Sequence, residues 1–374
     1  MGVKKIGILT GGGDCPGLNA VIRAVAKTCL IKNCAIVGFC DGYAGLVENR
    51  FIDITDKTVS GILDRGGTVL GTSNVANPLA YTLAPYGSPE KPADMTARVK
   101  EVAKQHKLDA LVAIGGDGTL TVGLELLKKG LPVVGVPKTI DNDLAATDVT
   151  FGFDSALAVA ADAVDKVHTT AESHHRVIVV ETMGRYAGWI ALRAGIAGGG
   201  DVILIPEIPF SNDAVCAAIQ HRRARGKKFS IVVAAEGAVN QKGEQVVAKR
   251  VAGSPEPVRL GGIGYRIGDA IEKGCGIETR VVVLGHLQRG GSPTAFDRWL
   301  ATRFGVHAAL LAIEGKCGMM ASLQGQHITE VSIEKAVKQL RRVDPAGEEV
   351  RVARSVGTSF GDPASLTTKP GGCL

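Results

Sequence analysis

Short apolar runs of strand length alternate with alanine-rich segments of helical length along most of the chain. The strand-like runs cover residues 6–10, 111–114, 131–136, 177–181, 202–207, 230–236 and 280–285. Segments with a helical pattern include residues 119–129, 155–172, 212–225 and 294–314. Such an alternation predicts an α/β fold, in which mostly parallel sheets carry helices on both faces.

The length of 374 residues is sufficient for two lobes, each with its own apolar core. We place the first lobe boundary near residues 150–154, and we expect the chain to return to the first lobe near Gly290–Pro293. Residues 1–152 and about 290–340 would then form one lobe, and residues 153–289 the other. Residues 345–374 are rich in Gly, Ser, Pro and Thr, so we expect a loose C-terminal tail.

Composition narrows the possible partners. A net charge of +6 is mildly basic, which suits phosphorylated small molecules but not the concentrated basic face that nucleic-acid binding requires. No signal peptide is evident, and no apolar run approaches the ~18 residues of a membrane span. We therefore expect a cytoplasmic protein that binds neither a membrane nor nucleic acid.

Acidic residues directly follow one of the apolar runs. The sequence Pro137-Lys138-Thr139-Ile140-Asp141-Asn142-Asp143 comes after residues 131–136. In an open α/β sheet, ligands bind at the carboxyl ends of the strands, so Asp141 and Asp143 would face a ligand. One carboxylate could contact a substrate hydroxyl while the other stays near a metal or a water. Phosphoryl transfer requires this division of roles.

Two glycine-rich segments also follow apolar runs. Residues 115–119 read Gly-Gly-Asp-Gly-Thr and precede a helical pattern, whose positive end would point at an anion; Asp117 could help to hold Mg²⁺. Residues 11–14 read Gly-Gly-Gly-Asp and precede a helix opened by Pro16. Neither segment has the spacing of a dinucleotide fingerprint, so both are interpreted as phosphate-binding loops.

Three further segments lie at the carboxyl ends of strand-like runs, and each can be interpreted in two ways. Residues 183–188 would place an arginine at a helix start, either to grip an anion or merely to lie at the surface. His286 and Arg289 are three apart, which suits a phosphomonoester, although a lone histidine is more often structural. Glu236 could accept hydrogen bonds from sugar hydroxyls or take part in a buried pair.

Two arginines occur at the opposite ends of strands. Arg176 precedes its strand and Arg280 begins one, so each would lie at the edge away from the ligand crevice. Within one subunit they read as surface charges. They could act in catalysis only at a neighbouring subunit's site.

Together these motifs resemble those of the 6-phosphofructokinase family. The resemblance covers residues 4–306 and comprises GGGDCPGLNA, GGTVLGTS, GGDGTL, PKTIDNDL, MGRYAGW, AAEGA and ETRVVVLGHLQRGGSP. GGDGT alone is shared with NAD kinases and lipid kinases. PKTIDND followed by MGRYAG and LGHLQRGG is specific to the family, so those two alternatives are disfavoured.

The resemblance implies transfer of a phosphoryl group to the 1-hydroxyl of fructose 6-phosphate in glycolysis. It makes Asp141 the general base and assigns Thr139, Lys138 and Arg185 to the reacting groups, with Asp117 as the ligand of Mg²⁺. The residues implied to bind the donor are Gly13, Asn74, Gly116, Asp117, Gly118 and Thr119. Those implied to bind the sugar phosphate are Thr139, Asp141, Asp143, Met183, Gly184, Arg185, Glu236, His286 and Arg289. Arg176 and Arg280 match arginines that act across a subunit interface, which implies a homotetramer or homodimer.

The identity of the donor depends on positions where the sequence has mixed features. Relatives that use pyrophosphate usually carry aspartate at the position of Gly118 and lysine at that of Lys138, whereas many ATP enzymes have glycine at both. Glycine at 118 leaves room for a nucleotide, so ATP is favoured and pyrophosphate is the alternative. Asn74 replaces an arginine of many relatives, for which Lys138 would substitute, and Val122 replaces a glycine. A sugar-phosphate sensor without activity is disfavoured, because all three acids are present.

Overall fold

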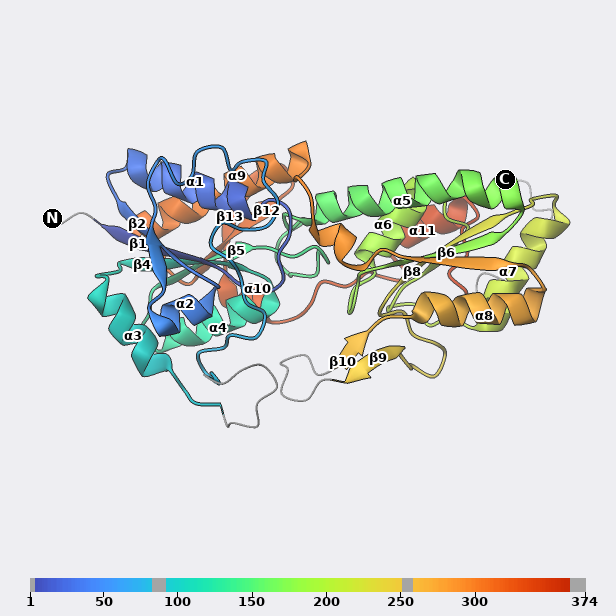
Figure 1. Cartoon of the computed structure of the whole chain (residues 1–374), viewed down its shortest axis with the longest axis horizontal. Helices are drawn as coiled ribbons and strands as arrows, with labels where there is room; N and C mark the ends of the chain where they lie inside the picture. Colours follow the sequence, from blue (N-terminus) through green and yellow to red (C-terminus); the bar gives the residue numbers. More distant parts are fainter. Residues whose placement is uncertain (1–3, 83–91, 251–257, 364–374) are drawn as a thin grey trace. The chain divides into compact units, whose positions relative to one another are not determined.

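The structure is a computed structural model, and it describes residues 4–82, 92–250 and 258–363. The described chain forms two compact units (Figure 1). Unit 1 consists of the residues up to 155 together with residues 289–341. Unit 2 consists of residues 156–250, 258–288 and 342–363. Within the described residues the assignment to a unit changes after residues 155, 288 and 341, so each unit is assembled from segments far apart in sequence.

Unit 1 contains a seven-stranded sheet in the order β13-β12-β5-β4-β1-β2-β3. Its strands are β1 (Lys5–Thr10), β2 (Ala35–Phe39), β3 (Phe51–Asp53), β4 (Ala110–Gly115), β5 (Val133–Pro137), β12 (Met319–Gln324) and β13 (His327–Ser332). All neighbouring pairs are parallel except those made by the edge strands β3 and β13. The central strands are almost fully buried because helices cover both faces, which explains their continuous apolar runs.

The helices of unit 1 form a layer on each side of this sheet. They are α1 (Leu18–Ile31), α2 (Tyr43–Glu48), α3 (Thr96–Gln105), α4 (Asp117–Lys128), α9 (Ala295–Glu314) and α10 (Ile333–Val337). Helices α1 and α9 pack together on one face, and α2, α3, α4 and α10 cover the other (Figure 1). The sequence segments around residues 20 and 305 are thus neighbours in space.

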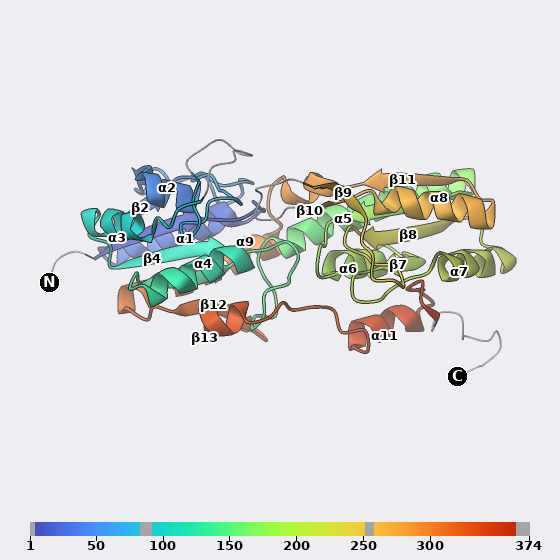
Figure 2. The same ribbon diagram turned by 90° about the horizontal axis from the view of Figure 1, so that it is seen from below.

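Unit 2 contains a four-stranded parallel sheet in the order β11-β6-β8-β7. Its strands are β6 (Val177–Thr182), β7 (Val202–Leu204), β8 (Ser230–Ala235) and β11 (Thr279–Val283), beside a hairpin of β9 (Val247–Arg250) and β10 (Val258–Leu260). The helices are α5 (Phe153–His174, which begins in unit 1), α6 (Trp189–Ala197), α7 (Asn212–Ala224), α8 (Ile263–Cys275) and α11 (Glu348–Ser355), with the 3₁₀ turn η1 (Gly285–Arg289). Figure 2 shows α7 and α8 side by side, and α11 near α6.

The predicted fold class is confirmed: both sheets are mostly parallel and lie between layers of helices. Six of the seven predicted strands agree closely with the structure, whereas the run 202–207 forms only the three-residue strand β7. No helix among the described residues is long and apolar enough to cross a membrane.

The expectation of a loose tail from residue 345 is wrong for the part that the structure describes. Residues 348–355 form α11, which packs against α6, and the side chains of Val350, Ala353 and Phe360 are buried. An ion pair of 2.7 Å joins Glu349 to Arg193 on α6. The apolar residues at 350 and 353 have helical spacing, and burying them outweighs the polar composition of the segment. Residues 364–374 lie outside the described residues.

Candidate active site

Two loops of unit 1 meet at the carboxyl ends of β1 and β4. Strands β2 and β4 flank β1 on opposite sides, so the strand order reverses beside β1, which is where α/β sheets bind ligands. The backbone N–H of Gly11 donates to the carbonyl of Ile114 at 2.9 Å. A Cβ atom at Gly11 would lie 2.6 Å from Oγ1 of Thr119. Glycine therefore permits the close approach of the two loops.

The first turn of α4 forms one wall of this site. The helix begins at Asp117, and Gly116 supplies no side chain to cap its N–H groups, which therefore remain able to bind an anion. The carbonyl of Thr119 accepts a 2.9 Å hydrogen bond from the hydroxyl of buried Tyr43, which anchors this turn. Gly118 is exposed, and a Cβ atom there would meet nothing within 4 Å.

Two cationic side chains contact the loop after β1. Lys138 is only 4% exposed, and its ammonium group donates to the carbonyl of Gly13. Burial lowers the pKa of Lys138, and the nearby charge of Arg289 lowers it further. Arg289 donates from Nη1 to the carbonyl of Asp14 at 3.0 Å. Two cations beside a glycine loop create a positive potential that favours a phosphate.

The two acids Asp117 and Asp143 are close enough to influence each other. Burial raises the pKa of both carboxyl groups, and the charge of Asp117 adds to the increase at Asp143. A hydrogen bond from Thr139 and the charge of Lys138 act in the opposite direction on the pKa of Asp143. Neighbouring carboxylates that are costly to ionise together suit a divalent cation with oxygen ligands.

This pair fits Mg²⁺ better than a metal enclosed by protein ligands. Within residues 4–82, 92–250 and 258–363, no group of three or more His, Cys, Asp or Glu side chains is placed to hold a metal. Mg²⁺ usually takes one or two carboxylates and completes its shell with water and substrate phosphates.

The loop that carries Asp141 is braced by its own hydrogen bonds. Oγ1 of Thr139 accepts from the backbone N–H of Asp141 at 3.1 Å. Asn142 is fully buried with φ of 52°, and its Oδ1 accepts from the N–H of Thr150 at 3.0 Å. The hydroxyl of Thr150 donates to the carbonyl of Thr139 at 2.8 Å. These contacts fix the backbone that presents Asp141 and Asp143.

Unit 2 gathers a second set of predicted residues at the carboxyl edge of its sheet. Register pairs Thr182 with Ala235 on neighbouring strands, and Glu181 with Val283. The residues that follow these strands therefore share one edge: Met183, Gly184, Arg185, Glu236 and His286.

Backbone contacts position several members of this set. The N–H of Glu236 donates to the carbonyl of Thr182 at 2.8 Å, and the N–H of Gly237 donates to the carbonyl of Gly184 at 3.1 Å. Nη2 of Arg185 donates to the carbonyl of Val258 at 2.7 Å, and its guanidinium lies 5.2 Å from the ring centre of Tyr186. His286 is exposed in η1. An arginine and a histidine at one sheet edge can bind an anionic group.

Arg176 and Arg280 lie at the other edge of this sheet, at the amino ends of β6 and β11. Nε of Arg176 forms a 2.7 Å ion pair with Glu278, which also pairs with Arg280. The charges of the two arginines help to hold the pKa of Glu278 below its usual value, with the hydrogen bond from Arg176 as the largest cause.

His286 and Arg289 both lie in η1, where residues three apart lie on the same side. The guanidinium of Arg289 also contacts the carbonyl of Asp14, and further residues lie beside the Gly13–Asp14 loop. Beside the same loop, the hydroxyl of Thr72 donates to Gly12 at 2.7 Å, and the carbonyl of Ser73 accepts from Gly12 at 3.0 Å. Asn74 follows them and is exposed.

The side chains of Thr72, Ser73, Tyr43 and Thr150 had no predicted role. The motif GGTVLGTS includes the first two, but nothing in the pattern marks Tyr43 or Thr150. Their hydroxyls donate to backbone carbonyls, that of Tyr43 to Thr119 and that of Thr150 to Thr139.

Comparison with known proteins places the chain in a family. The sequence profile of the family "Phosphofructokinase" matches residues 5–312. The "ATP-dependent 6-phosphofructokinase" of Chloroflexus aurantiacus is 50% identical over 361 residues, which cover 96% of this chain and 98% of that protein. The "Pyrophosphate--fructose 6-phosphate 1-phosphotransferase" of Streptomyces coelicolor is 49% identical over 359 residues, or 96% and 100% of the two chains.

A solved structure gives the same result. Phosphofructokinase from Pichia pastoris in the T-state superimposes with a TM-score of 0.79 and 32% identity over 90% of this chain. This chain spans only about a third of the length of that one, since the match covers 36% of it. With its profile match over most of the sequence and relatives near 50% identity along their whole length, the chain belongs to the phosphofructokinase family.

Proposed function

We propose that the protein transfers the γ-phosphoryl group of ATP to the 1-hydroxyl of fructose 6-phosphate, giving fructose 1,6-bisphosphate and ADP in the cytoplasm. The observation that carries this proposal is the cluster at the carboxyl ends of β1, β4 and β5. There, buried Lys138 contacts the Gly13 loop, and Asp117 and Asp143 interact beside the braced loop of Asp141. The names of the Chloroflexus and similar relatives support ATP and the sugar phosphate as substrates.

In this proposal Asp141 takes the proton of the attacking hydroxyl. Its backbone is held by Thr139 and the Asn142–Thr150 contacts, so the carboxylate needs little reorganisation during the reaction. Lys138 and Arg185 supply positive charge to the transferred group. Phosphoryl transfer depends mostly on alignment and on neutralising charge, which a buried cation does effectively.

Asp117 and Asp143 would hold Mg²⁺. When bound, Mg²⁺ neutralises charge on the donor phosphates and helps to orient them. The phosphates of the donor would lie against the N–H groups of residues 116–119 and the loop at Gly13, with Asn74 nearby.

Open space at Gly118 favours ATP as donor. A side chain there would meet no protein atom within 4 Å, so a nucleotide has room next to the first turn of α4. Pyrophosphate is a second candidate, because Lys138 is the residue that the pyrophosphate group is expected to carry and the Streptomyces relative is named for that donor. The two candidates differ only in the donor and share the acceptor.

The sugar phosphate would be bound by Met183, Gly184, Arg185, Glu236, His286 and Arg289, as the family resemblance implies. Arg176 and Arg280 would contribute to the site of a neighbouring subunit in a homodimer or homotetramer. Both arginines pair with Glu278 in the isolated chain. On assembly they would either leave Glu278 for the neighbouring site or contact both.

A coupled assay tests the proposal. Purified protein is supplied with fructose 6-phosphate, Mg²⁺ and either ATP or pyrophosphate, and fructose 1,6-bisphosphate is measured. Formation of fructose 1,6-bisphosphate with ATP is the expected result. If product forms with pyrophosphate but not with ATP, pyrophosphate is the donor. If no product forms with either donor, the proposed function is refuted.

Asp141→Asn tests the general base in the same assay. Turnover should fall ~10²–10⁴-fold, as expected for loss of one positioned base, while binding of fructose 6-phosphate is nearly unchanged. Asp64→Asn, at an exposed aspartate of the same unit, is the matched control and should behave as wild type. Turnover of Asp141→Asn within tenfold of wild type would reject the assignment.

A further inference from the structure

A second cavity lies in unit 1 at the opposite edge of the sheet from the proposed active site. Its volume is about 550 Å³, and it is widely open to solvent. Its lining comes from α3 and from the segments that precede β4 and β5: Lys100, Ala103, Lys104, Lys107, Leu108, Lys129, Gly130, Leu131 and Pro132. Strands β4 and β5 run from this cavity towards Gly116 and Lys138, so the two sites are separate.

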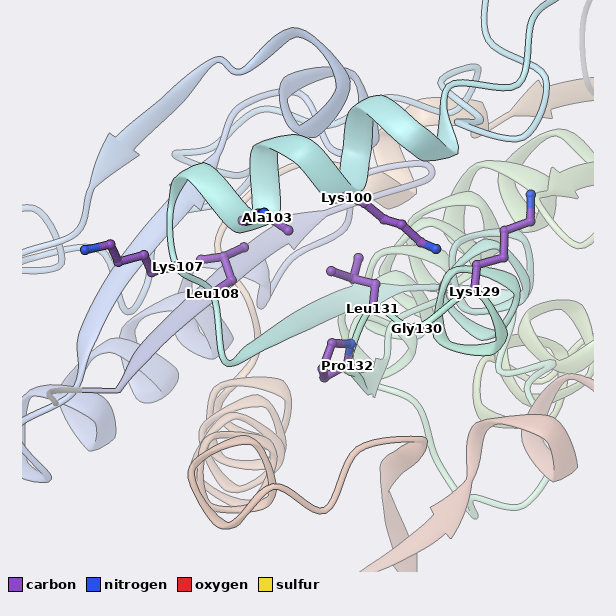
Figure 3. Close-up of a pocket in the computed structure, with 9 residues that line it drawn as sticks. Lys100, Ala103, Lys107, Leu108, Lys129, Gly130, Leu131 and Pro132 are labelled. Atoms are coloured by element: carbon purple, nitrogen blue, oxygen red, sulfur yellow. The ribbon is translucent and has the colours of Figure 1, made fainter. Parts of the chain in front are cut away.

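The cavity combines an apolar floor with a cationic rim. Figure 3 shows Leu108, Leu131 and Pro132 between Lys107 on one side and Lys100 and Lys129 on the other. Leu131 is 4% exposed, so the floor is part of the packed core rather than a loose surface. An apolar floor with charged groups at its margin suits a ligand that has an apolar body and a charged end.

Three of the four lysines have no acidic partner in the described part of the chain: Lys100, Lys104 and Lys107. Of the neighbouring acids, Asp109 accepts from the backbone N–H of Lys5 at 2.7 Å, and three others pair with cations. Glu101 pairs with Arg98, Glu125 pairs with Lys128, and Asp94 pairs with Lys129 at 2.9 Å. The rim therefore has an excess of positive charge that the protein does not compensate.

Lys107 occupies a backbone position that lysine rarely adopts. It follows the end of α3 with φ of 54°, and the N–H groups of Lys107 and Leu108 bond back to Lys104 and Ala103. Glycine or asparagine is the usual residue in this helix-ending motif. The same motif ends α1, where Asn33 stands at φ of 56°, and Gly130 ends α4 beside the cavity. A strained lysine at the rim points to a use for its side chain.

The favourable interaction of lysines with the helix dipole explains the position of only some of these lysines. Lys104 and Lys128 lie in the last turns of α3 and α4, where cations are stabilising. Lys100 lies in the middle of α3, and Lys107 lies beyond its end at a backbone cost. The dipole does not account for their position beside an apolar surface.

We propose that this cavity binds an organic anion with an apolar body, such as a phosphate monoester of an aromatic or alkyl group. The anionic end contacts the lysines of the rim, and the apolar body covers Leu108, Leu131 and Pro132. The binding is electrostatic in part, so it weakens as ionic strength rises.

Phenyl phosphate is the probe for this site, with inorganic phosphate and benzyl alcohol as probes that lack the apolar body or the charge. Lysines of the full chain are acetylated with a water-soluble acetylating reagent, with and without each probe, and the modified residues are quantified by mass spectrometry. Phenyl phosphate should protect Lys100, Lys104 and Lys107 from acetylation by at least about threefold, and the other two probes should protect them less. Absence of protection at these lysines, or equal protection by inorganic phosphate, overturns the proposal.

Two sets of variants complete the test by calorimetric titration of phenyl phosphate. Lys100→Gln with Lys104→Gln should weaken binding about tenfold, whereas Lys242→Gln with Lys273→Gln, exposed lysines of unit 2, should leave it unchanged. An equal effect of both pairs would show only a general response to net charge, and the proposal would fail.

Lys107→Gly separates binding from folding. Glycine is preferred at this φ, so the variant should unfold at the same or higher denaturant concentration and yet bind phenyl phosphate more weakly. Asn33→Gly makes the same backbone change at the end of α1 and should not alter binding. Unchanged affinity of Lys107→Gly would exclude a role for this side chain and refute the site as described.

Discussion

Replacing Lys138 with methionine should separate its role in catalysis from its role in folding. The side chain is 4% exposed, and its ammonium group contacts the carbonyl of Gly13 within reach of the charge of Arg289. Methionine retains most of the apolar stem and removes the charge. We expect Lys138→Met to fold as well as wild type and to lose most of its activity.

Opposing energies set the expected change in stability. The hydrogen bond from a charged donor to Gly13 contributes roughly 1.5–3 kcal/mol, which the variant loses. Removing a buried ammonium group saves a desolvation cost of several kcal/mol and the repulsion by Arg289, while the attraction of Asp14 and Asp143 for the charge is lost. The free energy of unfolding should therefore be unchanged or higher by about 1–2 kcal/mol.

The pH dependence of this difference has a defined sign. Burial lowers the pKa of Lys138 from its usual value, so the charged form costs stability at low pH, and the cost disappears as pH rises through that pKa towards the ordinary range. The advantage of Lys138→Met should shrink with rising pH.

Turnover should change much more than stability. Loss of one preorganised charge at a transferring group typically costs ~10²–10³-fold in kcat, or ~3–4 kcal/mol. The coupled assay with ATP measures turnover, and urea denaturation measures stability. Lys128→Met is the control, because Lys128 is exposed and pairs only with Glu125 at 2.7 Å. Turnover within tenfold of wild type, or a loss of stability large enough to leave the variant unfolded, would refute this reasoning.

Three other substitutions test two glycines of the site and a buried acid elsewhere in unit 1. Gly118→Asp should fold normally, since its side chain meets open space, but should raise the KM for ATP about tenfold or more through repulsion; an equal effect of Gly118→Asn would exclude charge as the cause. Gly11→Ala should destabilise by about 1–3 kcal/mol, because its Cβ would lie 2.6 Å from Thr119 Oγ1, and added Thr119→Ala should restore part of the loss in denaturant melts. Burial raises the pKa of Asp297 to about 6, so the free energy of unfolding should fall by up to about 3 kcal/mol as pH rises from 4 to 6. Asp297→Asn can still accept a hydrogen bond from Ser155, and its free energy of unfolding should change less over that range. Parallel profiles of the variant and the wild type would contradict the raised pKa.

Much of unit 1 could be predicted from local pattern. The apolar runs that became β1, β4 and β5 are buried on both faces, so they are almost continuously apolar rather than alternating. The glycine and acidic residues at their ends were recognisable because parallel strands bring their carboxyl ends to one edge. The same rule predicted the common edge of Met183, Glu236 and His286 in unit 2.

The remaining features depend on contacts between distant segments. Residues 345–363 looked like a tail because their composition is polar, yet Val350 and Ala353 of α11 are buried where the helix packs against α6, and Phe360 is buried after it. Arg289 lies three residues from His286 in sequence, but its guanidinium contacts Asp14, 275 residues away along the chain. Sequence spacing describes neighbours within one element only.

By itself the sequence determined the sheet-forming segments, the glycine loops and the family, because these depend on periodicity and short motifs. Only the tertiary structure decided that Lys138 is a buried cation with a lowered pKa, that Asp117 and Asp143 share one electrostatic environment, and that four lysines line a further cavity of unit 1. The reason is physical: burial and charge coupling depend on distances through space, and folding sets these distances between residues that are far apart along the chain.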